Sequence, residues 1–352
     1  MILPEIRGLG TAVPDTCYVQ EEILQLLRPY LNGNSRTEAI FRNAGIDSRH
    51  LEVAGEYYQQ ERTTQDRNER YMQAALPLGV QAIQRCLENA GMGIADVDDL
   101  IVVSCTGIDT PGLDLQLAGR LGMSPWLRRT TILGMGCYGA FPGLLRAREA
   151  AAAPRPAGGT GSALVLTVEI CSLHFQPNDH SLENIVSSAL FADGAAAALV
   201  TSRADAAAGP RLVDSATFSD YQTFDHMAFH LTDHGFRMSL SAYVPKLLAA
   251  SVETFVDTVL ERNGLRRADV DHWAVHPGSS KILDYVQERL DLTAEQLAPS
   301  RAVLARYGNM SSATVLFVLD EIQRKQQPAA GAYGMMMSFG PGLTMECALL
   351  RW

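Results

Sequence analysis

The chain has 352 residues, of which 47% are hydrophobic and 19% are charged, and its mean hydropathy is close to zero. This composition predicts a globular protein with a large core, made of one big domain or of two fused ones. The formal net charge of -10 and the isoelectric point of about 5.3 argue against nucleic acid as the main partner. They still allow a local basic patch that binds an anionic cofactor.

Signals for membrane insertion and secretion are missing from the sequence. No stretch of about 18 apolar residues occurs, so we expect no membrane span. The first residues, MILPEIRGLG, lack the basic region and the apolar run of a signal peptide. The six cysteines form no CxxC pair, so we expect neither structural zinc nor a disulfide framework. These features predict a cytoplasmic protein with reduced thiols and no bound metal.

Amphipathic helical patterns alternate along the chain with apolar runs that are typical of buried strands. In chain order we expect a helix over 68–91 that ends at a C-capping glycine, strands over 100–105, 163–170 and 195–202, and a second long helix over 245–265. This alternation predicts an α/β protein. The segments 151–162 and 202–210 contain proline and glycine and are expected to be surface loops, the second being a candidate boundary between halves 1–205 and 206–352.

Two separated segments indicate an internal duplication. The segment ADVDDLIVVSC begins at Ala95 and ADVDHWAVHPG begins at Ala268, an offset of 268 − 95 = 173 residues. The same offset carries Cys137 to position 310, inside YGNMSSATVLFVLDEI, where a glycine and small residues again precede a helical pattern. We therefore expect equivalent turns of the two halves to meet at a pseudo-twofold axis.

Three residues at or near these turns form a candidate catalytic set. Cys137, in GMGCYGAFPG, stands where an apolar strand run ends and a helical pattern begins, a place that favours a thiolate. His276, in AVHPGSSKILD, ends another strand run, and Asn309, in YGNMSSA, stands in a similar turn. Together they could form a thioester and hold a developing oxyanion or enolate.

Each of the three residues also has a purely structural explanation. A cysteine is often a small buried hydrophobe, a histidine often ends a strand, and an asparagine often forms a turn. Their equivalent places in the two halves favour catalysis over these explanations. A cysteine peptidase would use the same residue types, but it would not explain a duplicated chain.

In these motifs the chain resembles the type III polyketide synthases, the chalcone synthase-like branch of the thiolase superfamily. The resemblance runs from RGLGTAVP to SFGPGLTMECALL and includes ALFADGAAAALV, HPGSSKILD and YGNMSSATVLFVLDE. It implies a layered αβαβα fold built from two duplicated halves, and a homodimer. It also implies that malonyl-CoA and an acyl-CoA starter are used directly, without a metal or redox cofactor.

The resemblance assigns roles to the candidate catalytic set. It implies that an acyl-CoA starter acylates Cys137, while His276 and Asn309 bind the thioester carbonyl of malonyl-CoA. These two residues would stabilise the enolate that remains when carbon dioxide departs. The enolate then attacks the Cys137 thioester, the cycle repeats, and the poly-β-ketone cyclises in the same cavity.

The resemblance also implies residues of the substrate cavity. The family's gatekeeper phenylalanine falls on Phe191, and a second gate position carries the flexible, apolar Met238. Phe229, where plant enzymes usually have glycine, should fill the cavity floor. Arg42 matches the region in which the family binds CoA phosphates, although an isolated surface arginine would explain it as well.

Further cavity positions resemble the bacterial tetrahydroxynaphthalene synthases. Cys105 stands where plant enzymes carry a threonine that contacts the starter, and Cys171 and His174 in EICSLHFQPND should face the cavity. A core role for both cysteines and a strand-end role for the histidine remain open. Ser311 matches the small serine behind the catalytic asparagine. In SFGPG, Ser338 replaces a family glycine, from which we expect only a small shift.

The segment HMAFHLTDH places His226, His230 and His234 at four-residue spacing. On a helix these residues would form a metal-binding face. Thr232, Gly235 and the family resemblance favour extended structure instead, so we expect no metal here.

We expect a type III polyketide synthase that makes an alkylpyrone or alkylresorcinol, the more common product among the bacterial enzymes that it resembles; Met238 would tolerate the fatty-acyl starter. Cys105 and Phe229 favour the alternative of a tetrahydroxynaphthalene-type product from malonyl-CoA only. A synthase III-like enzyme that performs one condensation on a carrier protein is a rival, opposed by the Phe191 gate and the FGPG terminus. A non-catalytic acyl-CoA-binding protein of the same fold is a further rival, opposed by the complete catalytic set.

Overall fold

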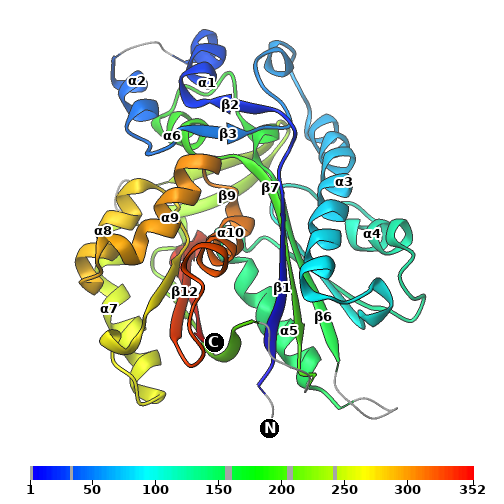
Figure 1. The fold of residues 1–352 in the computed structure, drawn as a ribbon. Helices are drawn as coiled ribbons and strands as arrows, with labels where there is room; N and C mark the ends of the chain where they lie inside the picture. The colour runs from blue at the N-terminus through cyan, green and yellow to red at the C-terminus, as the bar shows by residue number, and fades with distance from the viewer. Residues whose placement is uncertain (1–2, 32–34, 155–160, 204–208, 241–243) are drawn as a thin grey trace.

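The computed structural model describes residues 3–31, 35–154, 161–203, 209–240 and 244–352, with the backbone alone at 225, 240 and 244–250 (Figure 1). The strands are β1 (Glu5–Ala12), β2 (Cys17–Val19), β3 (Ser48–His50), β4 (Asp99–Ser104), β5 (Arg128–Leu133), β6 (Ser162–Ile170), β7 (Asp193–Thr201), β8 (Arg211–Ser219), β9 (Met227–Thr232), β10 (Gly235–Leu240), β11 (His272–Val275), β12 (Tyr333–Gly340) and β13 (Thr344–Arg351). The α-helices are α1 (Gln20–Leu27), α2 (Ser35–Arg42), α3 (Thr64–Ala90), α4 (Leu113–Leu121), α5 (Ala140–Ala152), α6 (Leu182–Leu190), α7 (Val244–Arg262), α8 (Ser280–Leu290), α9 (Ala294–Tyr307) and α10 (Thr314–Glu321).

One long sheet runs through both halves in the order β11-β12-β13-β8-β1-β7-β6-β4-β5. Its two parts are joined where β1 meets β8, at the single residue pair Glu5 and Arg211. The part from β5 to β1 belongs to the first half of the chain, and the part from β8 to β11 belongs to the second. Strands β9 and β10 form a separate hairpin outside this sheet.

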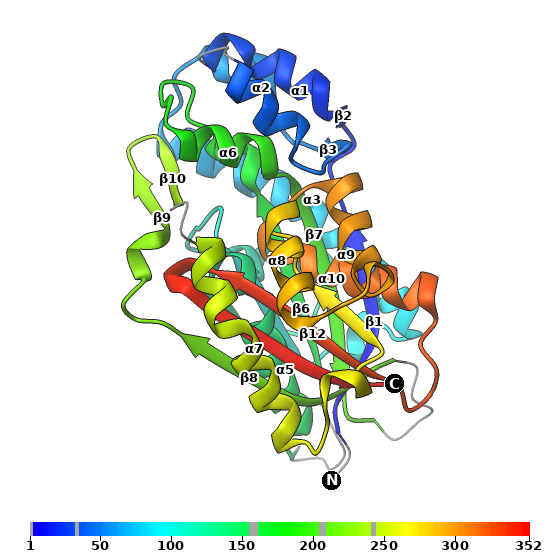
Figure 2. The same cartoon turned by 90° about the vertical axis from the view of Figure 1, so that its left-hand side faces the viewer.

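Helices and sheet parts alternate in layers (Figures 1 and 2). Helix α3 covers one face of β1, β6 and β7, and α7 covers β8 and β13 on the opposite side of the molecule. Helices α5 and α10 lie between the two sheet parts, where α5 contacts β6 and β13 and α10 contacts β7 and β12. Strands β6 and β7 are buried along their whole length because helices cover both faces, which explains their unbroken apolar sequences. This is the layered αβαβα arrangement expected from the sequence.

The predicted duplication is visible in the fold. Strands β4 and β11 begin at residues 99 and 272, so they keep the offset of 272 − 99 = 173 residues. Each central helix is preceded by a short 3₁₀ turn, η4 (Gly136–Tyr138) before α5 and η8 (Ser311–Ala313) before α10. The two turns contact each other in the middle layer. The chain therefore brings Cys137 and the residues after Asn309 together, as the duplication predicts.

Most predicted elements are confirmed, with small shifts at their ends. Helix α3 starts at a Thr63 capping box and ends before Gly91, whose left-handed φ of +63° makes it the predicted C-cap. Of the three spaced histidines, His226 ends the short 3₁₀ turn η6 (Phe224–His226), His230 lies on β9 and His234 lies in the turn before β10, so they share no helical face. The boundary predicted between 205 and 206 lies outside the described residues, as does 155–160 of the first predicted loop. Within the described ranges, no helix is both long and apolar enough to cross a membrane.

The first strand approaches α3 so closely that only glycine fits between them. A Cβ atom at Gly10 would lie 2.2 Å from the carbonyl oxygen of Ala82 and 2.3 Å from the backbone nitrogen of Cys86. Both contacts are with helix backbone, which cannot move aside locally. This approach fixes the distance between the outer helix layer and the first sheet part.

We expect Gly10→Ala to lower the free energy of unfolding by about 1–3 kcal/mol, because the added methyl group overpacks the strand–helix contact. Urea unfolding followed by circular dichroism measures this change. Gly119→Ala in α4 is the matched control, because a Cβ there meets nothing within 4 Å and alanine is the better helix former. Equal stability of the two variants would contradict the close contact.

Candidate active site

Cys137 is held at the N-terminus of the central helix α5. The turn that carries it needs Gly136, whose φ is +62° and whose Cβ would lie 2.7 Å from Cδ of Pro341. The C-terminal FGPG loop packs against this turn, and the Ser338 hydroxyl donates a 2.9 Å hydrogen bond to the Cys137 carbonyl oxygen. The serine that replaces a family glycine thus supports the backbone of the proposed nucleophile.

His276 directly follows β11 and is 1% exposed. Its backbone N–H donates to the Met337 carbonyl oxygen at 2.8 Å, which continues the pairing of β11 with β12. Neither ring nitrogen has a hydrogen-bond partner among the described residues. Buried polar atoms are normally satisfied, so an imidazole left in this state is suited to bind a substrate oxygen.

Asn309 lies between α9 and η8, and its side-chain amide has a fixed orientation. The Oδ1 atom accepts a 2.9 Å hydrogen bond from the Ser311 N–H, and Nδ2 donates to the Gly278 carbonyl oxygen at 3.2 Å. The backbone of Asn309 forms hydrogen bonds with both chain neighbours of Phe191. Its N–H donates to the Leu190 carbonyl oxygen and its carbonyl oxygen accepts the Ala192 N–H, each at 2.9 Å. The amide group and Phe191 therefore keep a fixed relative position.

All three proposed catalytic residues line one cavity of about 530 Å³. Part of its wall is apolar and comes from α6 and the β9–β10 hairpin, including Phe191 and Met238. Two cationic side chains, Arg36 and Lys281, are exposed residues that also line the cavity. The cavity therefore combines an apolar wall beside the proposed catalytic residues with positive charge toward solvent.

Arg42, which the resemblance pointed to, does not line this cavity. Its guanidinium is exposed and paired with Glu21 at 3.4 Å and with Glu38 at 3.2 Å. Arg36, about one and two-thirds turns earlier on α2, occupies the face of the helix that the cavity uses.

Burial keeps the proposed nucleophile and the imidazole uncharged in the free protein. It raises the pKa of the Cys137 thiol to about 12, although hydrogen bonds from Ser311 and Asn309 act in the opposite direction. Burial alone lowers the pKa of His276 to about 3. A neutral imidazole carries one N–H donor and one acceptor nitrogen, so it can take the thiol proton or donate to an oxyanion.

A buried carboxylate, that of Glu169 on β6, lies beside these residues. It accepts hydrogen bonds from the Cys105 N–H at 3.0 Å and from the hydroxyls of Thr106 at 2.7 Å and Ser312 at 2.5 Å. Burial raises its pKa, and the donors partly offset this effect. The donors come from both halves of the chain, so Glu169 joins them next to the cavity.

Cys105 and Ser311 lie between Glu169 and Cys137. The Cys105 sulfur is 3.4 Å from both carboxylate oxygens of Glu169 and 3.3 Å from the Ser311 hydroxyl oxygen. The Ser311 side chain also bonds to Cys137, and its backbone has an unusual φ of +48°. The two positions thus stand behind the nucleophile, and neither lines the main cavity or the smaller pocket, although the resemblance implied that Cys105 contacts the starter.

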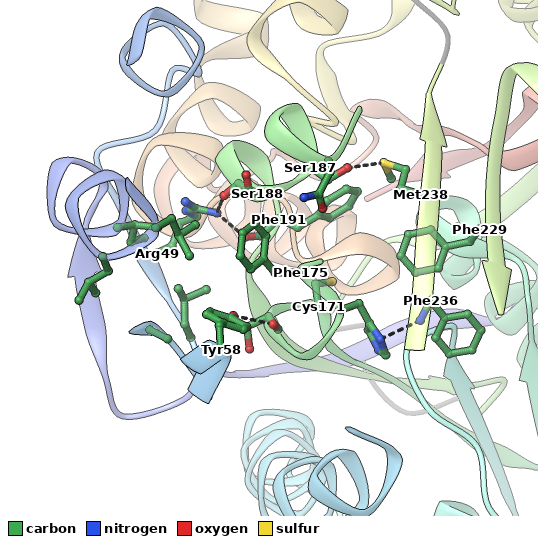
Figure 3. Close-up of a pocket in the computed structure, with 18 residues that line it drawn as sticks. Arg49, Tyr58, Cys171, Phe175, Ser187, Ser188, Phe191, Phe229, Phe236 and Met238 are labelled. Carbon is green, nitrogen blue, oxygen red and sulfur yellow. Dashed lines mark hydrogen bonds between the residues drawn. The ribbon is translucent and has the colours of Figure 1, made fainter. Parts of the chain in front are cut away.

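A second, smaller pocket of about 60 Å³ lies on the other side of Phe191 (Figure 3). Phe191 and Met238 line both spaces, so they form the partition between them. Cys171 and Phe229 line the small pocket, and Phe229 stacks on Phe236 with ring centroids 5.7 Å apart. The gate positions expected from the resemblance therefore lie where a gate would be needed.

His174 also lines the small pocket, but the backbone uses both of its ring nitrogens. Nε2 lies 2.8 Å from the Thr106 carbonyl oxygen, and Nδ1 accepts the Phe236 N–H at 3.2 Å. The imidazole is therefore neutral, and burial lowers its pKa to about 4, with the nearby Arg67 adding a smaller effect in the same direction. His174 anchors β10 to the end of β4 and leaves no ring nitrogen for a substrate.

Arg49 is a buried residue that the sequence analysis missed. It is 1% exposed, and its Nη1 atom donates to the carbonyl oxygens of Ser188 at 2.8 Å and Phe191 at 2.6 Å. Its Nε atom donates to the Gln20 side chain at 3.0 Å. Arg49 thus fixes the end of α6, and with it the backbone of Phe191.

Signals for two of the missed residues were present in the sequence. Glu169 is the only charged residue in the apolar run ALVLTVEI, and a lone charge in a buried strand indicates a polar partner. Phe236 stands opposite Leu231 in the β9–β10 hairpin. The next pair toward the turn contains Gly235, and glycine is typical of hairpin turns, so the pairing of Phe236 could have been inferred from the sequence. Arg49 had no such signal, because the carbonyl groups that it binds come from a distant helix end.

A thiolase-like layered fold that brings a cysteine, a histidine and an asparagine into one cavity defines a carbon–carbon condensing enzyme. Residues 4–204 match the family model for the N-terminal domain of chalcone and stilbene synthases, and residues 216–352 match the model for the C-terminal domain. The chain therefore belongs to the chalcone and stilbene synthase family and is a type III polyketide synthase. Enzymes of this class are acyltransferases that catalyse decarboxylative condensation.

Curated relatives span nearly the whole chain. A 3,5-dihydroxyphenylacetyl-CoA synthase from Amycolatopsis orientalis is 33% identical over 99% of this chain and 94% of its own length. A 1,3,6,8-tetrahydroxynaphthalene synthase from Streptomyces peucetius subsp. caesius is 33% identical over 99% of this chain and 93% of its own length. The crystal structure of the tetrahydroxynaphthalene synthase from Streptomyces coelicolor A3(2), a bacterial type III polyketide synthase, has a TM-score of 0.91 at 30% identity over 98% of both chains.

The buried neutral His174 predicts a specific dependence of stability on pH. Its pKa is about 4 in the folded protein and about 6.5 when unfolded, so the unfolded state binds the extra proton between these values. The contribution of His174 to the free energy of unfolding is therefore fully present above about pH 6.5 and is lost as the pH falls toward 4. Relative to His174→Gln, the wild type should lose about 2 kcal/mol of unfolding free energy between pH 7 and pH 5.

Urea unfolding of both proteins at several pH values measures this difference. The comparison with the variant removes the contributions of the other titrating groups, whose pKa values are common to both proteins. A constant stability difference between pH 7 and pH 5 would show that His174 titrates normally in the folded state.

Proposed function

We propose that this synthase loads a short acyl-CoA starter on Cys137, extends it with malonyl-CoA and cyclises the chain to a compact aromatic product. The observation that carries the proposal is that Cys137, His276 and Asn309 share one cavity of about 530 Å³, whereas the pocket behind Phe191 measures about 60 Å³. The smaller space is sufficient for a few water molecules but not for a long alkyl chain.

The roles of the three residues follow from their protonation states and positions. His276 accepts the Cys137 proton as the thiol attacks the starter thioester, and the proton then passes to the departing CoA thiolate. For extension, the N–H groups of His276 and Asn309 donate to the thioester oxygen of malonyl-CoA. They stabilise the enolate that forms as carbon dioxide leaves, and the enolate carbon then attacks the acyl group on Cys137, which releases the Cys137 thiolate and leaves the extended chain on CoA.

Arg36 and Lys281 are better placed than Arg42 to bind the CoA phosphates. Both line the cavity that holds the proposed catalytic residues and both are exposed, whereas Arg42 is already paired with Glu21 and Glu38. A guanidinium and an ammonium together would neutralise phosphate charge while the pantetheine arm enters the cavity.

The choice of product differs from the expectation based on Met238 alone. A fatty-acyl starter would need space behind the partition, where Phe229 and Phe236 stack. The similar enzymes that are named for 3,5-dihydroxyphenylacetyl-CoA and 1,3,6,8-tetrahydroxynaphthalene support a compact aromatic product here. The alkylpyrone or alkylresorcinol product remains the second candidate, favoured by the flexibility of Met238.

Mass spectrometry of products from malonyl-CoA, alone and with acetyl-CoA to long-chain acyl-CoA starters, tests this proposal. We expect aromatic polyketides from malonyl-CoA or short starters, and none from Cys137→Ala. Asn309→Ala should still acquire an acyl group on Cys137, seen as a mass increase of the intact protein. Its extension rate should fall by about 10²–10³-fold, because one oxyanion donor is lost.

Other outcomes would redirect the proposal. Efficient extension of long-chain starters with little product from malonyl-CoA alone would support the alkylpyrone alternative. A single extension that requires carrier-bound malonate would support the synthase III-like alternative. Folded protein that takes up no acyl group from any CoA thioester would leave only an acyl-CoA-binding role.

We further propose that the enzyme is a homodimer formed through β5. This strand is one of the two edges of the long sheet, and most of its residues are exposed. An edge strand can pair with its own copy across a twofold axis, which satisfies the free backbone groups on both sides. Exposed apolar side chains of Leu133 and Ile108, 40% and 53% accessible, occur at and near this edge.

Light scattering tests the dimer. The wild type should have twice the chain mass of 38.2 kDa, and Leu133→Lys should shift the equilibrium toward the monomer because it places a charge at the expected interface. Leu231→Lys on β9 is the control, because Leu231 is 64% exposed at a different surface. A wild-type mass of one chain at micromolar concentration would reject the dimer.

A further inference from the structure

The β9–β10 hairpin forms one side of the partition between the two cavities. Met238 on β10 pairs across the strands with Phe229 on β9. Met238 lines both cavities. Met238 and Phe229 both line the small one (Figure 3). A two-stranded hairpin outside a larger sheet is only marginally stable by itself. The position of this wall must therefore be set by contacts with other elements.

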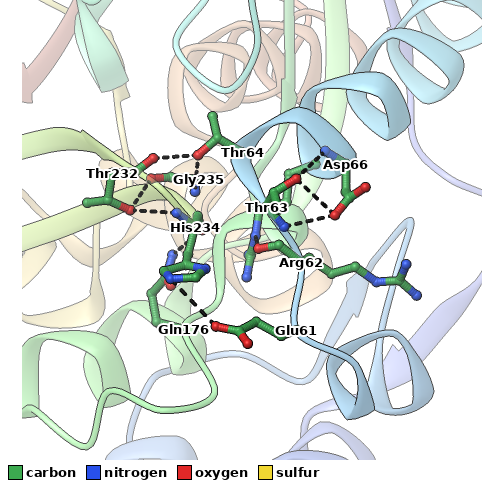
Figure 4. A network of polar contacts seen from close by, with 10 residues as sticks. Glu61, Arg62, Thr63, Thr64, Asp66, Gln176, Thr232, His234 and Gly235 are labelled. Atoms are coloured by element: carbon green, nitrogen blue, oxygen red, sulfur yellow. Dashed lines mark hydrogen bonds and ion pairs between the residues drawn. The ribbon is translucent and has the colours of Figure 1, made fainter.

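One anchor holds the hairpin turn on the N-terminus of α3 (Figure 4). The Thr64 backbone N–H donates to the Asp233 carbonyl oxygen at 2.8 Å. The Thr64 hydroxyl donates to the Thr232 carbonyl oxygen and accepts the Gly235 N–H at 2.7 Å. These bonds fix the tip of the hairpin relative to α3, but they do not reach the other side of the partition.

A second anchor is the side-chain amide of Gln176, in the segment between β6 and α6. Its Nε2 atom lies 3.0 Å from the His234 carbonyl oxygen and 3.3 Å from the Phe236 carbonyl oxygen, one at the turn and one on β10. It also lies 3.0 Å from the carbonyl oxygen of His174. One amide thus holds the hairpin to the segment that carries His174.

The backbone of the same residue is tied to α6. The Gln176 N–H donates to Oδ1 of Asn184 at 3.3 Å, and Nδ2 of Asn184 donates to the Gln176 carbonyl oxygen at 2.8 Å. Asn184 is buried in the first turn of α6, the helix whose C-cap is Phe191. Gln176 therefore connects the hairpin through its side chain and the gate helix through its backbone.

The two sides meet at the partition itself. The Ser187 hydroxyl oxygen on α6 is 2.9 Å from the Met238 sulfur, and 2.7 Å from the carbonyl oxygen of Glu183 one turn earlier. A hydroxyl has one proton, and the carbonyl is the stronger acceptor, so the sulfur is held against the oxygen mainly by packing. A small movement of β10 away from α6 would therefore separate Met238 from Ser187 at low cost.

We propose that Gln176 is a positioning residue that sets the width of the passage between the cavities and thereby limits the length of the acyl starter. This inference rests on the proposed function, because it concerns the starter that reaches Cys137. Gln176 touches neither cavity, and its effect passes through Met238 on one side and α6 on the other. Loss of its donors should let the hairpin move outward and join the small pocket to the main cavity.

Gln176→Leu removes the donors with little change in size, and Gln176→Glu replaces them with a carboxylate that faces three carbonyl oxygens. For both variants we expect the ratio of kcat/KM for decanoyl-CoA to that for acetyl-CoA to rise by at least about tenfold. A factor of about ten is the lower end of the discrimination that an apolar pocket achieves between substrates that differ by one methylene group. Acetyl-CoA turnover should stay within about twofold of the wild type, since the proposed catalytic residues are untouched.

Gln65→Leu is the matched control, because this exposed glutamine on α3 donates only to the neighbouring Glu69 among the described residues. It should leave the starter ratio unchanged. A generally destabilised enzyme would lose activity with all starters in proportion. An unchanged ratio in both Gln176 variants would overturn the proposal.

Hydrogen exchange provides a readout that does not depend on catalysis. In Gln176→Leu, exchange should accelerate both in 228–239 of the hairpin and in 182–191 of α6, because one residue ties them together. Acceleration in the hairpin alone, or in neither segment, would overturn the proposal. If the wild type takes no acyl group onto Cys137 from any acyl-CoA, the proposed function fails, and exchange still decides whether Gln176 links the two elements.

Discussion

The arrangement of the site depends on one buried charge, the carboxylate of Glu169. Removing a carboxylate from water is costly unless donors replace the lost hydration, and here N–H and hydroxyl donors do so. Because Ser312 comes from the second half and Cys105 from the first, the same charge joins η8 to the end of β4. Ser311, the residue before Ser312, forms a side-chain hydrogen bond with Cys137. Asn309 is in turn placed by the hydrogen bond that its side chain accepts from the Ser311 N–H.

The second constraint is the burial of the proposed nucleophile and of the imidazole. Burial disfavours the charged forms of both Cys137 and His276, so the free protein holds a neutral thiol beside a neutral imidazole. In such a site Cys137 and His276 become charged only during the reaction, when the substrate supplies an oxygen on which negative charge can be stabilised. A neutral His276 also has an N–H for the enolate at every stage of the cycle, so extension does not require it to gain a proton first.

The sequence predicts which residues meet in the main cavity, because these residues lie in local motifs at duplicated positions. Cys137 and His276 each follow an apolar strand run, and the 173-residue offset brings the turns together without any knowledge of distant contacts. The sequence does not identify the cationic residue of α2 that lines the cavity, since the resemblance pointed to Arg42 and Arg36 was not singled out. The two residues are six apart, about 240° around the helix, so only one can face the cavity, and the sequence pattern does not say which. Arg49 and Gln176 were also missed, since they act on backbone carbonyls that carry no side-chain signature.

This use of backbone carbonyls has a consequence for how such an enzyme can change its product. Arg49 fixes the end of α6 through the carbonyl oxygens of Ser188 and Phe191, and Gln176 fixes the hairpin through those of His234 and Phe236. Every residue type has a carbonyl group, so the side chains at these positions are free to vary while the anchors persist. Wall residues can therefore be exchanged without moving the walls, and the hairpin wall can be moved without touching Glu169 or the central turns. On the hairpin side, control of chain length is thus physically separate from control of bond formation, whereas on the α6 side the backbone of Asn309 ties the two together.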